Sequence, residues 1–393
     1  MKIGFFIPEF PGQTHSFFWR EMQAIQALFG HETSIVSTRK PPQPVAHEWV
    51  AQAHADYLFP VPVPGLLRAG LHLLRHLPRL LRDRDTRALL GNLRLWAMLL
   101  MAARLSLHAR RAGIDHLHVH SCANAALIAA FCNRLCGLRY SLVLHGPVED
   151  YGPHQPYKWR RAEFVFVITE VLRAQMAERL PEAADKMHVV PMGVDTDRFA
   201  PAAAPPAPPP FRWFSCARLN RIKGFETLLD AFARVARSHP DLPWQLFIAG
   251  EDEQGGSGYR KTLEARIDAG GLQDRVTLLG AVTQQEVLRN LQISHGFVLA
   301  SHHEPLGVAY MEAMACALPT IGTDAGGVRE LITDGQDGLL VPPQDAEALA
   351  TALVRIMTAP EEAATLATAG RDRIIADFGA ARSAKALGAC LSG

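Results

Sequence analysis

The sequence has few cysteines, and none of them stands in a metal-binding pattern. All six, at positions 122, 132, 136, 216, 316 and 390, lack a C-x-x-C partner and the cysteine–histidine spacing of zinc sites. Such usage is typical of a reducing compartment. The distribution of Asp and Glu shows no metal triad either, so we expect neither a metal ion nor a bound cofactor.

Long hydrophobic runs are also missing. The best uncharged apolar run, residues 95–103, is nine residues long, whereas a membrane-spanning helix needs about 20. The composition, 48% hydrophobic and 20% charged, is that of a folded protein and excludes a disordered chain. A length of 393 residues favours two domains of roughly 100–200 residues each.

The formal net charge is only +1, but it is unevenly distributed. Residues 1–196 carry 22 Lys and Arg against 16 Asp and Glu, or +6, and residues 197–393 carry 18 against 23, or −5. Segment 64–111 alone holds ten Arg and two Asp. A basic half suits an anionic partner such as a membrane surface or phosphate groups, or is a solvated basic face. We expect no nucleic-acid partner.

A basic amphipathic helix is predicted within segment 64–111, and Pro78 is expected to kink or divide it. Four arginines share one face: Arg68, Arg75, Arg79 and Arg82. Four leucines are predicted on the opposite side: Leu67, Leu71, Leu74 and Leu81. Such a helix is typical of an interfacial membrane segment. The alternative is a helix that packs on its own sheet and leaves its arginines in solvent.

Short apolar strands alternate with helical patterns along most of the chain, which predicts parallel sheets covered by helices. The predicted strands are residues 3–7, 33–37, 117–120, 141–145, 164–169, 211–217, 244–249, 276–279, 296–300, 320–322 and 338–341. Segment 201–210, PAAAPPAPPP, reads as a semi-rigid linker. We therefore predict two doubly wound α/β domains, 1–200 and 211–374.

The densest group of candidate binding residues lies between 301 and 330. Pro305 suits the first turn of a helix with Glu304 just before it, and a helix N-terminus attracts phosphate. Glu304 and Glu312, with seven residues between them, are placed to hold an elongated ligand at two points. A second glycine-rich turn, residues 324–330, enters another helix. Upstream, Arg218 and Lys223 follow a predicted strand and suit a diphosphate clamp.

At this point the sequence resembles a known family. The segments ARLNRIKG (217–224), HEPLGVAYMEAMACALP (303–319), PMGVDTDRF (191–199) and TDAGGVRELITDGQDGLLVPPQD (323–345) are similar to those of the retaining glycosyltransferase family 4. The sequence also resembles the branches of this family that build bacterial exopolysaccharides and glycolipids. The resemblance implies a GT-B fold, that is, two Rossmann-like domains with a cleft between them. It also suggests that a helix at about 375–393 packs back on the N-terminal domain.

The resemblance implies roles for matching residues in the C-terminal half. Arg218 and Lys223 are expected to neutralise the donor diphosphate, and Glu304 to bind the donor sugar. Glu312 is expected to bind the ribose, and the loop with Val282 to face the base. The backbone amides of three residues are expected to approach the sugar and phosphates: Leu306, Gly307 and Val308.

In the N-terminal half the match is looser. DHLHVH (115–120) resembles the family's D-x-x-H-x-H segment, so His120 is expected near the reacting centre, and His145 to face the acceptor. The strand-end positions of both residues support this independently. The family commonly has a Gly-Gly loop after the first strand. Here only Gly12 allows a close backbone approach to the donor, so it is the expected donor-binding residue of this loop, which departs from that pattern.

We therefore expect a metal-independent retaining hexosyltransferase that acts by front-face displacement. Its co-substrate is expected to be a nucleotide-diphospho-sugar, and its acceptor a lipid-linked saccharide or glycolipid at an anionic membrane surface. A cytoplasmic, peripheral location at the inner face of the membrane follows from that acceptor. The alternatives are another GT-B reaction, namely nucleotide-sugar epimerisation or phosphorolysis, and a non-catalytic sugar-nucleotide-binding module.

Overall fold

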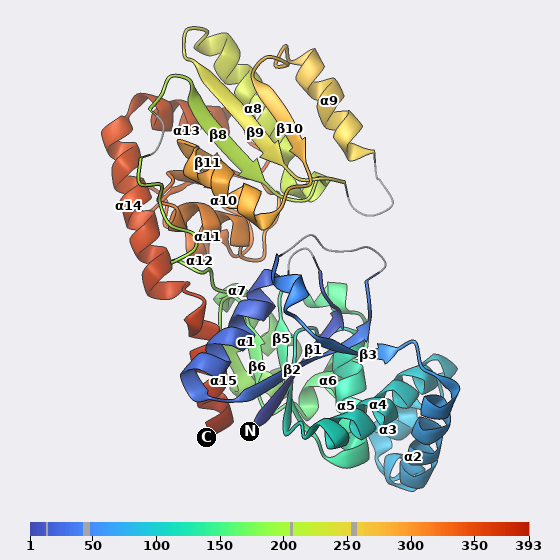
Figure 1. The fold of residues 1–393 in the computed structure, drawn as a ribbon. Coiled ribbons are helices and arrows are strands. Elements are labelled where there is room, and N and C mark those ends of the chain that lie inside the picture. Colours follow the sequence, from blue (N-terminus) through green and yellow to red (C-terminus); the bar gives the residue numbers. More distant parts are fainter. Residues whose placement is uncertain (13–14, 42–47, 205–206, 253–257, 393) are drawn as a thin grey trace. The chain divides into compact units, whose positions relative to one another are not determined.

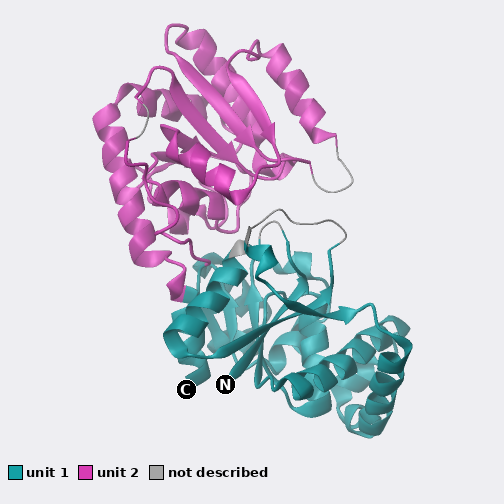
Figure 2. Ribbon diagram, in the orientation of Figure 1, with its two compact units in different colours: residues 1–191, 383–393 teal, residues 192–382 magenta. Residues whose placement is uncertain are grey.

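A computed structural model describes residues 1–12, 15–41, 48–204, 207–252 and 258–392 (Figure 1). The chain divides into two compact units (Figure 2). The first unit comprises Met1–Pro191 and Ser383–Gly393, and the second comprises Met192–Arg382. Each unit is a parallel sheet with helices packed on it, so the predicted α/β class is confirmed.

The described part of the first unit holds a seven-stranded parallel sheet in the order β3-β2-β1-β4-β5-β6-β7. Its strands are β1 (Lys2–Glu9), β2 (Glu32–Arg39), β3 (Ala55–Phe59), β4 (His116–Val119), β5 (Arg139–Leu144), β6 (Val165–Val167) and β7 (Met187–Val189). β1 has five consecutive buried residues, as expected for a parallel strand covered on both faces. The sequence prediction missed β3, where polar residues interrupt the apolar pattern, and the three-residue β7.

Helices cover both faces of this sheet (Figure 1). They are α1 (Ser16–Phe29), α2 (Val63–Arg82), α3 (Arg84–Leu89), α4 (Leu93–Ala112), α5 (Asn124–Cys136), α6 (Gln155–Arg160), α7 (Glu170–Arg179) and α15 (Ala381–Ser392). The 3₁₀ turns are η1 (Glu48–Ala51), η2 (Val148–Tyr151) and η3 (Pro181–Lys186). α1 and α15 share one core with alternate residues of β1, while α5 contacts β1, β4 and β5.

The described part of the second unit holds a six-stranded parallel sheet in the order β10-β9-β8-β11-β12-β13. Its strands are β8 (Phe211–Cys216), β9 (Trp244–Ala249), β10 (Val276–Gly280), β11 (Gly296–Val298), β12 (Thr320–Thr323) and β13 (Leu339–Val341). Its helices are α8 (Phe225–Ser238), α9 (Tyr259–Ala269), α10 (Gln284–Gln292), α11 (Val308–Ala315), α12 (Val328–Leu331), α13 (Ala346–Thr358) and α14 (Pro360–Asp377), with a 3₁₀ turn η4 (Arg221–Lys223). Every one of these strands matches a predicted one.

The observed division of the chain differs from the predicted boundaries at 200 and 374. Residues 192–200 belong to the second unit because Val194 donates to and accepts from the backbone near Gly379, and because Arg371 donates to the carbonyl oxygen of Phe199. The chain returns to the first unit at Ser383 and not at 375. Of the predicted linker, residues 205 and 206 lie outside the described residues.

Helix α2 is a single helix that contains Pro78, so of the predicted kink or division at this residue the division is wrong. It packs on α4 and α5 through its buried residues Ala69, Leu73 and Leu80. The four leucines of the predicted apolar row are exposed instead. At 3.6 residues per turn, the leucine row lies beside the arginine row and not opposite to it. The helix therefore has three faces: one buried, one apolar and exposed, and one basic.

Among the described residues, none of the helices combines the length and apolar character that crossing a membrane requires.

Candidate active site

The sheet of the second unit reverses its winding between β8 and β11. From β8 the chain builds outward through β9 and β10, and then returns to place β11 on the other side of β8. In open α/β sheets, ligands bind beyond the carboxyl ends of the strands at such a reversal. The loop after β8 carries Arg218 and Lys223, and the loop after β11 carries Glu304. The topology therefore gathers the predicted residues at the most favourable edge.

Lys223 and Glu304 form a direct ion pair, 2.5 Å from Nζ to Oε2. The hydroxyl of Ser301 donates to the same carboxylate oxygen at 3.2 Å. Glu304 is 8% exposed and Ser301 is fully buried. In this low-dielectric position the two charges interact more strongly than they would at the surface.

The backbone of the β8 loop fixes Lys223. The Asn220 side chain accepts a hydrogen bond from the Lys223 amide and so caps η4. Gly224 ends this turn in the left-handed conformation, with φ of 67°. A side chain at Gly224 would put its Cβ 1.7 Å from the carbonyl oxygen of Ala300, so only glycine fits here. The β8 loop is therefore pressed against the end of the β11 strand.

The loop that carries Glu304 is held from both sides. On one side the His302 amide donates to the carbonyl oxygen of Ile222 at 2.7 Å. On the other, Gly327 donates to the Glu304 carbonyl oxygen at 2.9 Å. This second contact comes from the predicted glycine-rich turn, which enters α12 as expected. The loops after β8 and β12 thus fix the loop after β11, which carries Glu304.

Helix α11 begins at Val308, so the predicted helix start at Pro305 is wrong. Gly307 precedes the helix with φ of 100°, a conformation that a helical residue does not adopt. Leu306, Gly307 and Val308 therefore form the entry to the helix, where backbone N–H groups have no intrahelical acceptor. Their expected function as amide donors to an anion is compatible with this position.

Glu312 lies in α11, half-buried, one turn beyond the helix start. Burial raises the pKa of the Cys216 thiol to about 12, and the negative charge of Glu312 adds to that effect. Cys216 is the last residue of β8. The Glu312 carboxylate is therefore electrostatically coupled to the end of the same strand that leads to Arg218 and Lys223.

The remaining predicted residues of this unit are more peripheral. Arg218 is exposed, two residues beyond the end of β8. Val282 follows β10, which β9 separates from β8, and it stands just before the capping box of α10 formed by Thr283 and Glu286. Val282 is thus at the same carboxyl edge of the sheet but two strands away from the Lys223–Glu304 pair.

The sheet of the first unit reverses between β1 and β4. Gly12 follows β1, and its carbonyl oxygen accepts from the amide of His15 at the start of α1. His120 follows β4 and His145 follows β5, with His120 Nδ1 3.5 Å from His145 Nε2. The structure therefore brings the two predicted histidines together. Burial lowers the pKa of each to about 3, so both are neutral at neutral pH.

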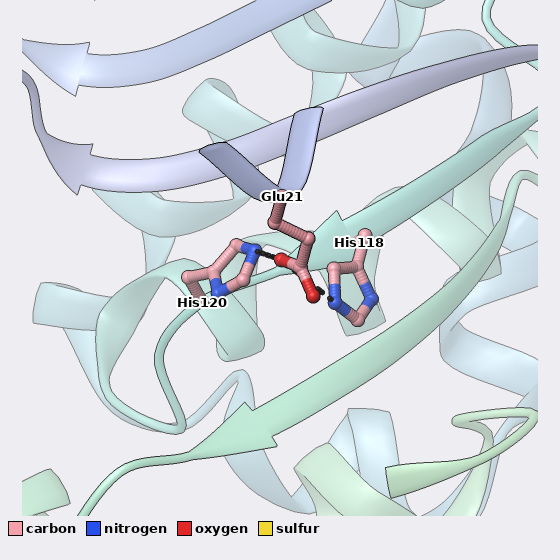
Figure 3. A group of neighbouring side chains, drawn as sticks. All are labelled: Glu21, His118 and His120. Carbon is pink, nitrogen blue, oxygen red and sulfur yellow. Dashed lines mark ion pairs between the residues drawn. The ribbon is translucent and has the colours of Figure 1, made fainter. Parts of the chain in front are cut away.

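Sequence reasoning missed two residues that lie against His120. Glu21 projects from α1 toward β4, and His118 lies beside it on β4 (Figure 3). The available signal was the spacing of His118 and His120, because residues two apart in a strand point to the same face. Glu21 gives no signal in the sequence, since its neighbours on β4 are distant along the chain.

Two family models together match most of the chain. The model described as "Glycosyltransferase Family 4" matches residues 20–198, and "Glycosyl transferases group 1" matches residues 201–373. The putative colanic acid biosynthesis glycosyltransferase WcaL of Salmonella typhimurium is 24% identical over 96% of both chains. A glycogen synthase of Mycobacterium tuberculosis is 27% identical over 57% of this chain, and the match covers about half of that protein's length, 53%.

A solved structure shows the same fold over the full length. HepE from Anabaena, in complex with UDP and glucose, superposes with a TM-score of 0.76 and 17% identity, and the match covers 100% of both chains. The two parallel sheets and this likeness give the chain a GT-B fold. The two family models, which follow one another along the sequence and together match most of the chain, show that the chain belongs to glycosyltransferase family 4.

Proposed function

We propose that this protein transfers a sugar from a nucleotide-diphospho-sugar to a membrane-associated acceptor with retention of the anomeric configuration. The observation that carries the proposal is the buried Lys223–Glu304 pair at the β8/β11 reversal, with Glu304 eight residues before Glu312 along the chain. The HepE structure, which contains UDP and glucose, supports a nucleotide-sugar donor.

The donor is proposed to lie along the carboxyl edge of the second unit's sheet. Lys223 and Arg218 neutralise the diphosphate, and the amides at the start of α11 donate to it. Glu304 accepts hydrogen bonds from sugar hydroxyls, and Glu312 accepts them from the ribose, because a carboxylate has acceptor sites for vicinal hydroxyls. On donor binding, Lys223 exchanges part of its contact with Glu304 for the phosphate.

The proposed chemical step is a front-face displacement. The bond from the anomeric carbon to the diphosphate oxygen breaks, while the acceptor oxygen bonds to that carbon on the same face. The acceptor proton passes to the departing diphosphate. Catalysis then rests on positioning and on the positive charge of Lys223, Arg218 and the α11 N-terminus around the leaving group. No step of this proposal passes through a metal ion.

The acceptor is proposed to bind at the first unit, where His145 and His120 end neighbouring strands. Three alternative functions can be distinguished from sugar transfer by their requirements. An epimerase would convert the donor without any acceptor, a phosphorylase would require orthophosphate, and a binding module would bind the nucleotide without turnover.

Helix α2 supports a membrane-associated acceptor. Its outward apolar row is strongly exposed, at 64% for Leu67, 68% for Leu71 and 64% for Leu74. A contiguous apolar row that faces solvent commonly marks an interaction site. The adjacent exposed row is basic: Arg68, Arg75, Arg79 and Arg82. Apolar insertion flanked by cations fits an anionic lipid surface, which we propose as the occupant.

Substitution of the four α2 arginines by glutamine is expected to weaken binding to anionic vesicles by on the order of 10²–10³-fold, since each cation contributes about 1 kcal/mol near such a surface. Vesicle sedimentation at low salt measures this. The matched control removes four exposed arginines of the second unit: Arg234, Arg237, Arg289 and Arg382. Equal loss in the control and the α2 variant would show that α2 has no special part in binding.

A panel of nucleoside diphosphates and their sugars identifies the donor by thermal unfolding. The nucleotides of one base are expected to raise the unfolding temperature, because a ligand at about 100 times its Kd adds roughly 2.7 kcal/mol of stability. The shift is expected to vanish in Glu312→Ala and to persist in Glu361→Ala, an exposed glutamate of α14. If none of the nucleotides shifts the unfolding temperature, the proposed donor site is wrong.

A further inference from the structure

The carboxylate of Glu21 and the imidazoles of His118 and His120 form a buried cluster in the first unit, for which the proposed transfer reaction assigns no common task. Glu21 comes from α1, and the two histidines come from β4 and its end (Figure 3). One ligand-type atom from each residue lies within 4.8 Å of the other two. The three residues are at most 5% exposed.

The distances suit a shared metal ion. The Glu21 oxygen Oε2 lies 3.0 Å from His120 Nε2 and 3.9 Å from His118 Nε2. A tetrahedral zinc ion with bonds of about 2.0–2.1 Å separates its ligand atoms by roughly 3.3 Å. The two observed separations lie on either side of that value, and the longer one must shorten by about 0.6 Å to reach zinc geometry.

The two Nε2 atoms are buried and lack a hydrogen bond. Although the carboxylate is close, neither His118 Nε2 nor His120 Nε2 completes a hydrogen bond within the described part of the chain. A buried polar atom without a partner is costly and rare in native proteins. A cation placed between the two nitrogens and the carboxylate would satisfy all three groups at once.

The opposite ring nitrogens are already held, as they are in metal sites. His118 Nδ1 lies 2.8 Å from the Ser141 hydroxyl, and His120 Nδ1 lies 3.5 Å from His145 Nε2. Metal-ligating histidines almost always use the second ring nitrogen for such an outer contact, which orients the ring. Both Nε2 atoms therefore face Glu21.

We propose that Glu21, His118 and His120 bind one divalent transition-metal ion of the zinc class, which ties α1 to β4 in the first unit. Two imidazole nitrogens and one carboxylate oxygen are ligands that zinc accepts, whereas Mg²⁺ and Ca²⁺ prefer oxygen alone. The ion holds His120 through Nε2 and leaves its Nδ1 to His145, so His145 is the histidine that remains for the acceptor. The proposal goes beyond the transfer reaction and does not depend on the donor.

The test measures metal binding directly on the full-length protein. The protein is stripped with a chelator, dialysed against Zn²⁺ and then against metal-free buffer, and analysed by mass spectrometry of its metal content. We expect one equivalent of zinc. Co²⁺ in its place is expected to show the visible bands of a tetrahedral site without thiolate charge transfer. This distinguishes the site from one on the thiols of Cys132 and Cys136, which lie 3.8 Å from each other on α5. Absence of retained metal would overturn the proposal.

Ligand variants locate the ion. Glu21→Gln and His118→Asn are expected to lower the zinc affinity by about 100-fold or more, because each removes one of only three protein ligands. His116→Asn is the matched control: His116 is equally buried on β4 and shares the Ser141 hydroxyl at 2.8 Å, but it is not a ligand. It is expected to retain one equivalent. Equal affinity in Glu21→Gln and the wild type would overturn the proposal.

A milder variant covers the case in which a ligand variant does not fold. Ser141→Ala keeps all three ligands and removes the hydroxyl that contacts both His118 and His116. Because the outer contact orients the His118 ring, the zinc affinity is expected to fall by roughly 10–100-fold. Near-ultraviolet circular dichroism checks that the fold is kept. Unchanged affinity in a folded Ser141→Ala variant would contradict the assigned orientation of His118 and, with it, this site.

Discussion

Lys223→Ala is expected to reduce kcat/KM for sugar transfer by roughly 10²–10³-fold, the usual effect of removing one preorganised charge from a transition state. The donor for this assay is the nucleotide sugar that the unfolding panel selects. Lys223 lies 2.5 Å from Glu304, at the reversal of the sheet where the diphosphate is proposed to bind. Its loss should therefore lower kcat as well as raise KM.

The same substitution also leaves Glu304 buried without its cation. Breaking a fully buried pair costs about 3–5 kcal/mol, and a smaller cost is expected here because both side chains keep slight exposure, 16% and 11%. The double variant Lys223→Ala with Glu304→Gln should recover much of this stability, since no unpaired charge remains. Urea unfolding of the single and double variants measures the difference, separately from activity.

Arg221→Ala is the matched control for Lys223. Arg221 stands in the same 3₁₀ turn, but its side chain is 75% exposed and pairs with Glu226. Surface pairs of this kind contribute little, so the rate is expected to stay within about twofold of the wild type. If Lys223→Ala behaved like Arg221→Ala, Lys223 would have no part in donor binding.

Gly224→Ala is expected to destabilise the second unit by at least about 4 kcal/mol, a size that only a few mechanisms produce. The added Cβ would sit 1.7 Å from the Ala300 carbonyl oxygen, and φ at this position is 67°. Relief requires the β8 loop to move away from β11, which also displaces Lys223. Thermal unfolding should show a fall of roughly 10 °C for a unit of this size.

Gly335→Ala separates the clash from the backbone conformation. Gly335 has φ of 72°, close to that of Gly224, but an added Cβ there meets no atom within 4 Å among those described. It should cost only about 1–2 kcal/mol, the ordinary penalty for a left-handed residue. Similar unfolding temperatures for the two variants would mean that the close approach to Ala300 is not a constraint on the fold.

Much of the fold follows from local pattern. Short apolar runs bounded by Gly, Pro and polar residues predicted 11 of the strands that the structure contains, because a strand covered on both faces needs continuous apolar residues. The same pattern located the loops after β8 and β11, and with them Arg218, Lys223 and Glu304. It did not find β3 and β7, whose sequences carry little of that signal.

Helical periodicity predicted which residues share a face of a helix but not which face is buried. It grouped the leucines and arginines of α2 into rows, yet the structure buries Ala69, Leu73 and Leu80 and leaves the leucine row exposed. Periodicity says which residues share a face, while long-range packing decides which face is covered. In α2 that packing comes from α4 and α5.

The sequence by itself determined most of the strands along the chain, the glycine turns and the residue types at the strand ends, because these depend on neighbours a few positions away. Only the tertiary structure decided that Lys223 meets Glu304, 81 residues further along, and that Glu21 meets His118 and His120. Each of these contacts depends on which strands are neighbours in the sheet. That order is set by the packing of the whole unit, so a local pattern does not contain it.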